Sequence, residues 1–120
     1  MKSKNQLELV IRNELNAIQQ LYGLNIVLDR LIYQLEKDFA RANSQFTGKL
    51  SVENRTNWAK ELQQVLKTMT EADIQHLLYI IDVPEEILHH KVAKEVRLDF
   101  VSQYILLREL QKVQFQLRFK

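Results

Sequence analysis

The sequence predicts an all-α fold, and three observations lead to that prediction. Apolar residues recur in the first third of the chain at steps of four and three, which keeps them on one side of a helix. The same spacing returns in later segments. Only two Gly and one Pro occur in 120 residues, too few for the turns of a many-stranded sheet. We therefore expect residues 1–120 to form one helical bundle, with a long N-terminal helix, a middle helix, a short helix and a long C-terminal helix.

Residues 5–42 carry the most regular repeat. Nine of its eleven positions are apolar, and the positions are Leu7, Ile11, Glu14, Ile18, Leu21, Asn25, Leu28, Ile32, Leu35, Phe39 and Ala42. Gly23 lies in the middle, so the segment is either one helix bent at this residue or a hairpin of two helices. Because the repeat stays in phase across Gly23, the sequence favours one continuous helix, about 57 Å long at ~1.5 Å per residue.

Two polar residues, Glu14 and Asn25, interrupt this apolar repeat. They could be ligands in a pocket of the bundle. A structural role is the favoured interpretation, because one polar residue among apolar seam positions can fix the register of packed helices. Asn25 is the better candidate for a paired, buried amide.

The middle of the chain contains clear boundaries. Residues 43–50 are polar and include the second Gly, which predicts a loop. Ser51 or Asn54 can cap the next helix, whose apolar repeat reaches Met69. Thr70 predicts another N-cap, before a short helix over about residues 71–81.

The last helix is expected to begin near Pro84, because proline suits the first helical position. Apolar residues occur on nearly all sides between Val96 and Leu110, which places this helix in the middle of the structure or in a subunit interface.

Residues 112–120 allow two interpretations. Apolar and polar residues alternate there as in a strand, yet a lone strand has no partner in a helical chain. The favoured alternative is a helix with Val113 and Leu117 on one face and with Phe115 and Phe119 on another.

The composition argues against several functional classes. The chain has no Cys, so disulfide and thiolate chemistry are excluded. The longest apolar runs are far shorter than the ~20 residues of a membrane span. No apolar signal region follows the first residues, so we expect a cytoplasmic protein. The net charge of +2 is not concentrated in one basic block, as it usually is in a nucleic-acid binder.

Two acid–histidine pairs are the nearest approach to a metal motif. Asp73 with His76 and Glu86 with His89 have the i,i+3 spacing that di-iron bundles use. Further converging ligands are needed for a metal site, and the neighbouring sequence does not supply them. We therefore interpret both pairs as solvated side chains. No catalytic, cofactor-binding or metal-ligating residue is expected, and the protein is not expected to be an enzyme.

The sequence best supports a non-enzymatic protein–protein interaction or assembly module that buries apolar helix faces. A helix of ~57 Å would project beyond a compact domain of this length, whose radius of gyration is about 14 Å. A second copy, forming a homodimer, or another helical protein would then cover it. The expected interface residues are Leu28, Ile32, Leu35, Phe39, Phe115 and Phe119. The alternative function is a nucleic-acid-associated accessory protein that uses the basic C-terminal segment.

Overall fold

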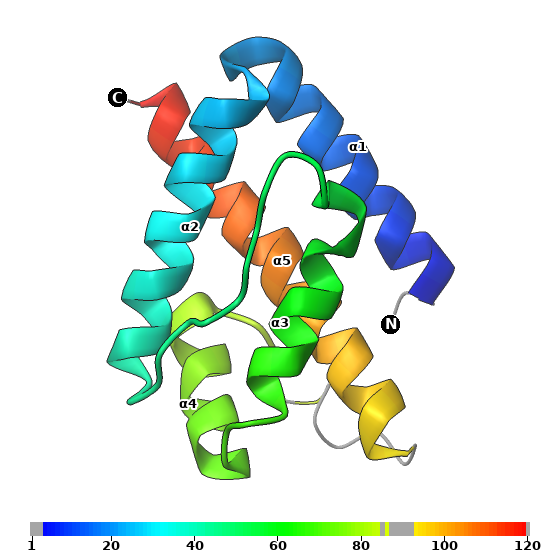
Figure 1. The fold of residues 1–120 in the computed structure, drawn as a ribbon, viewed down its shortest axis with the longest axis vertical. Helices are drawn as coiled ribbons and strands as arrows, with labels where there is room; N and C mark the ends of the chain where they lie inside the picture. Colours follow the sequence, from blue (N-terminus) through cyan, green and yellow to red (C-terminus); the bar gives the residue numbers. More distant parts are fainter. Residues whose placement is uncertain (1–3, 85, 87–92, 120) are drawn as a thin grey trace.

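The computed structural model describes residues 4–84, 86 and 93–119, and in this part of the chain it is helical without a strand (Figure 1). The all-α prediction is therefore confirmed. The elements in order are α1 (Lys4–Tyr22), α2 (Leu24–Arg41), the short 3-10 helix η1 (Arg55–Asn57), α3 (Trp58–Leu66), α4 (Glu71–Ile81) and α5 (Lys94–Arg118).

The predicted continuous N-terminal helix is wrong, and the hairpin alternative is correct. Gly23 alone joins α1 to α2, with φ +87° and ψ 143°, a conformation that glycine adopts readily because it has no Cβ. The Gly23 N–H donates to the Gln19 carbonyl at 2.8 Å and so closes the last turn of α1. The longest dimension of the molecule is 38 Å, which leaves no room for a 57 Å helix.

The apolar repeat continues in phase across the chain reversal, because α1 and α2 each bury their own apolar face in the core. Residues on both sides of the hairpin, such as Ile18 and Leu28, are buried, whereas Leu21 beside the turn is 70% exposed. Asn25 is also exposed, so its prediction as a paired buried amide is wrong. The physical reason is that the hairpin turn puts the middle of the repeat at the end of the bundle.

The segment before α3 forms a capped turn. The Ser51 N–H donates to Asn54 Oδ1 at 2.8 Å, and the Asn54 N–H donates to Ser51 Oγ at 3.3 Å. The indole N–H of the buried Trp58 donates to the Ser51 carbonyl at 2.9 Å. Because these bonds stabilise a turn and η1 follows it, α3 is shorter than the helix expected to reach Met69.

The short fourth helix matches its prediction. Thr70 Oγ1 accepts a hydrogen bond from the Asp73 N–H at 3.1 Å, which satisfies one of the free donors at the start of α4. At the other end, Asp82 adopts a left-handed conformation with φ 70°, and the Val83 N–H donates to the Leu78 carbonyl. These bonds fix both ends of α4.

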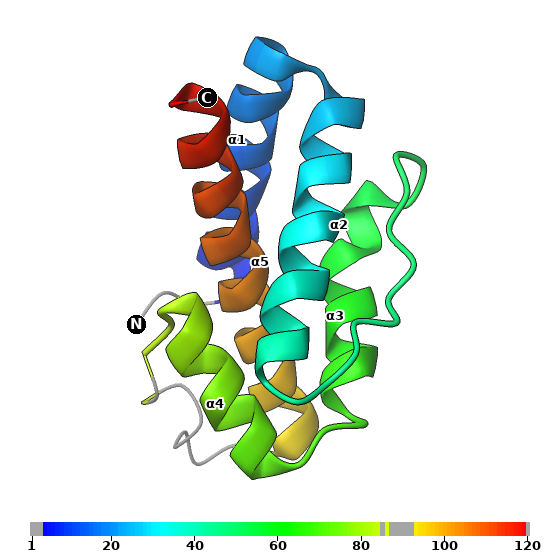
Figure 2. The ribbon, with the colours of Figure 1, turned by 90° about the vertical axis from the view of Figure 1, so that its left-hand side faces the viewer.

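The last helix begins at Lys94 and not at Pro84, which lies in irregular structure. Most of the intervening residues, 85 and 87–92, lie outside the described part of the chain. Helix α5 continues to Arg118, so the helical interpretation of the C-terminus is confirmed. The apolar residues on nearly all sides of α5 predicted a central position. The helix does occupy the middle of the bundle and packs against α1, α2, α3 and α4 (Figures 1 and 2). None of the described helices has the length and hydropathy required to cross a bilayer.

Candidate functional site

The predicted interface residues fall into two groups. Leu35 and Phe39 are completely buried and Leu28 nearly so, all within the core of this single chain, and Ile32 packs at its edge. Because the hairpin folds α2 back onto α4 and α5, the apolar stripe of α2 is covered by the chain itself. The structure therefore corrects the choice of Leu28, Leu35 and Phe39 as surface contacts.

The second group, Phe115 and Phe119, lies on the surface at the end of α5. Their side chains are 65% and 67% exposed. The ring centroids are 4.8 Å apart, and the guanidinium of Arg118 lies 5.8 Å from the Phe119 ring centroid. Val113 and Leu117 of the same turns are buried, so the helix separates a core face from an exposed aromatic face as expected.

A shallow groove of about 250 Å³ lies between α2 and the end of α5. Leu117 of α5 lines it together with Ile26, Asp29, Arg30 and Tyr33 of α2. Ile26 and Tyr33 are 55% and 56% exposed. Figure 1 shows the end of α5 beside the first half of α2, so the groove and the aromatic pair both lie at this end of α5. We call this surface the α2–α5 face, comprising Ile26, Asp29, Arg30, Tyr33, Phe115, Arg118 and Phe119.

The α2–α5 face carries charges of both signs beside its apolar residues. Asp29 provides a carboxylate, and Arg30 and Arg118 provide guanidinium groups. Within the described part of the chain, none of these three side chains takes part in an ion pair. The charges therefore remain free for another molecule.

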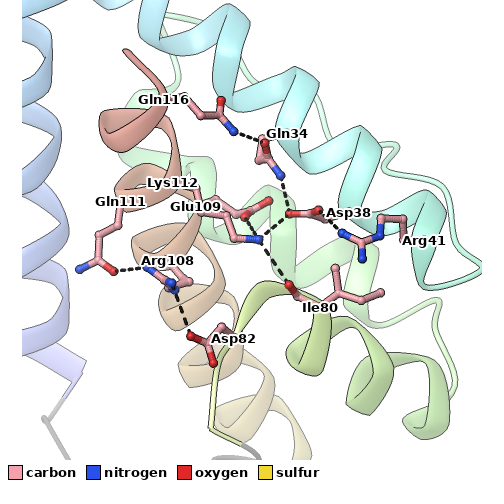
Figure 3. Close-up of polar contacts among 10 residues, drawn as sticks. All are labelled: Gln34, Asp38, Arg41, Ile80, Asp82, Arg108, Glu109, Gln111, Lys112 and Gln116. Atoms are coloured by element: carbon pink, nitrogen blue, oxygen red, sulfur yellow. Dashed lines mark hydrogen bonds and ion pairs between the residues drawn. The ribbon is translucent and has the colours of Figure 1, made fainter. Parts of the chain in front are cut away.

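A buried polar network lies between α2, α4 and α5 (Figure 3). Lys112 Nζ of α5 is 3.2 Å from Asp38 Oδ2, 3.7 Å from Glu109 Oε1 and 3.4 Å from the Ile80 carbonyl oxygen. The Gln34 amide donates to Asp38 Oδ2 at 2.9 Å, and the Gln116 amide donates to Gln34 Oε1 at 2.7 Å. The network thus connects α2 and α5 through side chains and reaches α4 through the Ile80 carbonyl.

Two carboxyl groups of this network, Asp38 and Glu109, are 0% exposed. Burial is the main cause that raises the pKa of Glu109, and a hydrogen bond with Asp38 and the charge of Asp38 add to it. The ammonium of Lys112 acts in the opposite direction, and the resulting pKa of Glu109 is about 9. Glu109 is therefore protonated at neutral pH.

The proton on Glu109 also adds a hydrogen bond to the network. Both Glu109 oxygens and Asp38 Oδ1 are buried, and no other hydrogen of the described residues is donated to them. A proton shared between the two carboxyl groups satisfies one oxygen of each group, and it leaves one negative charge for the ammonium of Lys112. The pair resembles a carboxyl dyad in its electrostatics, but it lines neither the groove beside Leu117 nor a cavity between α1, α3 and α5. Its role in this structure is to hold helices together.

Two residues of the basic C-terminal segment, which carries the nucleic-acid alternative, pair with acidic side chains of the same chain. Lys112 belongs to the buried network. Arg108 Nη2 is 3.5 Å from Asp82 Oδ2 at the surface. Arg118 is exposed at the end of α5. This arrangement does not assemble a continuous positive face.

The acid–histidine pairs do not converge with other metal-binding groups in the described part of the chain. His76 is exposed on α4 and Asp73 is half-buried beside it. No group of three or more His, Asp or Glu side chains is placed to hold a metal ion among the described residues. His89 lies outside the described residues.

The sequence analysis missed the buried network. A signal was present, because Gln34 and Asp38 are separated by four residues beside the apolar stripe of α2. Glu109, Lys112 and Gln116 follow at spacings of three and four on α5. Polar side chains that recur every three or four residues on the buried faces of two helices are expected to form hydrogen bonds or ion pairs with each other.

Comparison of the chain with family models, with curated proteins and with solved structures gave no match. The functional proposals below therefore rest on the geometry of the described residues.

Proposed function

We propose that this protein is a non-enzymatic helical interaction module that associates with a second copy of itself through the α2–α5 face. The observation that carries the proposal is the exposure of Phe115 and Phe119, whose rings contact each other, together with the exposure of Tyr33 and Ile26 on the neighbouring helix α2. Phenylalanine, tyrosine and arginine are the residue types enriched at the centres of protein interfaces. The 57 Å helix that suggested a homodimer at first is absent, so the proposal now depends on this face alone.

A second copy is the partner that fits the charges of the face. In a two-fold dimer, the same patch on each subunit meets itself, so opposite charges within the patch can pair across the axis. Asp29 of one subunit can therefore meet Arg30 or Arg118 of the other. A uniformly charged patch would instead repel its own copy.

The apolar area also suits a modest dimer interface. A standard interface covers about 800 Å² per partner. Three aromatic side chains and Ile26, each more than half exposed, provide roughly half of that area at 150–250 Å² per buried aromatic. The charged residues and groove edges supply the polar rim that such interfaces have. A cytoplasmic location remains a prediction of the sequence.

Sedimentation equilibrium tests the proposal. We expect the wild-type chain to show a mass close to twice 14.3 kDa that falls on dilution. The double variant Phe115→Ser, Phe119→Ser should be a monomer with an unchanged circular-dichroism spectrum, because both side chains are exposed. Tyr79→Ser is the matched control, since Tyr79 is an aromatic residue 81% exposed on α4, away from the face.

Two results would refute this function. One is a wild-type monomer at every concentration that stays in solution. The other is a dimer that the double serine variant leaves intact. The nucleic-acid alternative is tested by fluorescence anisotropy with labelled single-stranded and duplex DNA at low salt, where electrostatic binding is strongest.

A further inference from the structure

A cavity of about 370 Å³ lies between α1, η1, α3 and α5, separate from the α2–α5 face. Figure 1 shows the start of α3 beside α1, with α5 behind them. Its volume falls in the range of small-molecule sites. The cavity combines an apolar floor with a polar rim.

The apolar floor is formed by Ile11 and Leu15 of α1, Ala59 of α3 and Leu106 of α5. Three of these side chains are at most 8% exposed, so the floor is part of the packed core. An apolar surface that is rigid in this way can hold the body of a ligand without rearrangement.

The polar rim carries more positive than negative charge. Arg12 and Arg55 line the cavity from two different elements, and Glu8 is the acidic residue of the lining. Neither guanidinium takes part in an ion pair with a described residue. Two unpaired guanidinium groups against one carboxylate favour a ligand with a single negative charge.

Gln103 supplies a polar group inside the cavity. Its side chain lines the cavity and is only 7% exposed, and it makes no hydrogen bond with any described residue. Its amide atoms are not among the fully enclosed polar atoms without a partner, so they open onto the cavity and are accessible to a ligand. A ligand with a hydroxyl, carbonyl or carboxyl group in the cavity would satisfy this amide.

We propose that the cavity between α1, α3 and α5 binds a small organic acid. The carboxylate interacts with Arg12 and Arg55, the apolar body packs on Ile11 and Leu106, and the Gln103 amide hydrogen-bonds a polar atom of the ligand. This site shares no residue with the α2–α5 face, so ligand binding can be tested independently of self-association.

The test uses 4-phenylbutyrate and octanoate as probes, titrated into the ¹⁵N-labelled full-length protein and followed by NMR. The neutral 4-phenylbutyramide is the matched ligand control. We expect saturable binding of at least one acid, with movement of the Gln103 side-chain amide signals, which are identified by their loss in Gln103→Leu. The neutral 4-phenylbutyramide should bind roughly tenfold more weakly than 4-phenylbutyrate, because it cannot form the charge-assisted hydrogen bonds of a carboxylate.

Variants separate a binding site from an ordinary surface depression. Arg12→Gln and Arg55→Gln should each weaken binding of the acid roughly tenfold, whereas the exposed control Lys37→Gln on α2 should leave it unchanged. Gln103→Leu should weaken binding, because leucine cannot form a hydrogen bond with the polar atom of the ligand.

The proposal is overturned by any of three results. The first is that neither 4-phenylbutyrate nor octanoate binds saturably. The second is that 4-phenylbutyrate and 4-phenylbutyramide bind with equal affinity. The third is that both Arg12→Gln and Arg55→Gln leave the affinity for the acid unchanged.

Discussion

The replacement of Glu109 by glutamine provides a direct test of the buried network. Glutamine has nearly the shape of a protonated glutamic acid and can still donate a hydrogen bond to Asp38, but it cannot lose a proton. In the wild-type protein, burial raises the pKa of Glu109 from 4.5 to about 9. The two proteins should therefore differ in how their stability depends on pH.

The sign of this dependence follows from the direction of the pKa change. Between pH 4.5 and about 9 the folded state keeps the Glu109 proton and the unfolded state has lost it. The contribution of Glu109 is therefore complete below about pH 4.5, declines as the pH rises toward 9, and changes no further above that value.

The magnitude follows from one proton. A difference of one bound proton changes the free energy of unfolding by about 1.4 kcal/mol per pH unit. From pH 5.5 to 8.5, the wild-type protein should lose about 4 kcal/mol relative to Glu109→Gln. Because groups outside the network are common to both proteins, the difference between them reports Glu109 together with the Asp38 and Lys112 groups that contact it.

Urea unfolding at several pH values and constant ionic strength measures this difference. The fluorescence of Trp58, which is completely buried, and circular dichroism can report the same transition. Glu36→Gln is the matched control, because Glu36 is an exposed glutamate on α2. If the Glu109→Gln difference is as independent of pH as that of the control, Glu109 is not buried as a neutral acid and the reasoning fails.

Three further predictions concern the core and the hairpin. Lys112→Met should lower the free energy of unfolding by about 3 kcal/mol, because Asp38 stays buried without its ammonium partner; adding Asp38→Asn should restore most of the loss, and simple additivity in urea titrations would contradict this. Leu35→Ala should lower the free energy of unfolding by about 2–5 kcal/mol in urea titrations and leave the oligomeric mass in solution unchanged. A fall from dimer to monomer mass at unchanged stability would instead make Leu35 an interface residue. Gly23→Ala should lower the melting temperature and reduce the free energy of unfolding by about 1–3 kcal/mol, because alanine is strained at a positive φ. If the free energy of unfolding instead rose by about 1 kcal/mol, residues 5–42 would form one continuous helix.

The hairpin illustrates the limits of the sequence repeat. The 4-3-4 spacing reported correctly that residues such as Ile18 and Leu28 are buried on helices. It could not report what covers them, because a helix buries the same stripe against its own chain or against another copy. The choice of Leu35 and Phe39 as interface residues failed for this reason, whereas Phe115 was correctly expected on a separate face of its helix.

Local signals were more reliable where local bonds decide the structure. Thr70 was predicted as an N-cap, and its hydroxyl accepts the expected hydrogen bond. The same kind of signal at Ser51 and Asn54 was partly misread, because these residues stabilise a turn before η1 instead of starting α3. Side chain–backbone bonds within four residues can be inferred from sequence, but a turn and a helix begin with similar bonds.

The sequence by itself determined the helical class, the Thr70 cap and the apolar faces, because these depend on residues three or four positions apart. The tertiary structure alone decided the reversal at Gly23, the approach of Glu109 to Asp38 across 71 residues, and the position of Gln103 in a cavity between helices. Such placements depend on which helices pack together, and many distant pairings satisfy the same local pattern. Only the packing of the whole chain selects one of them.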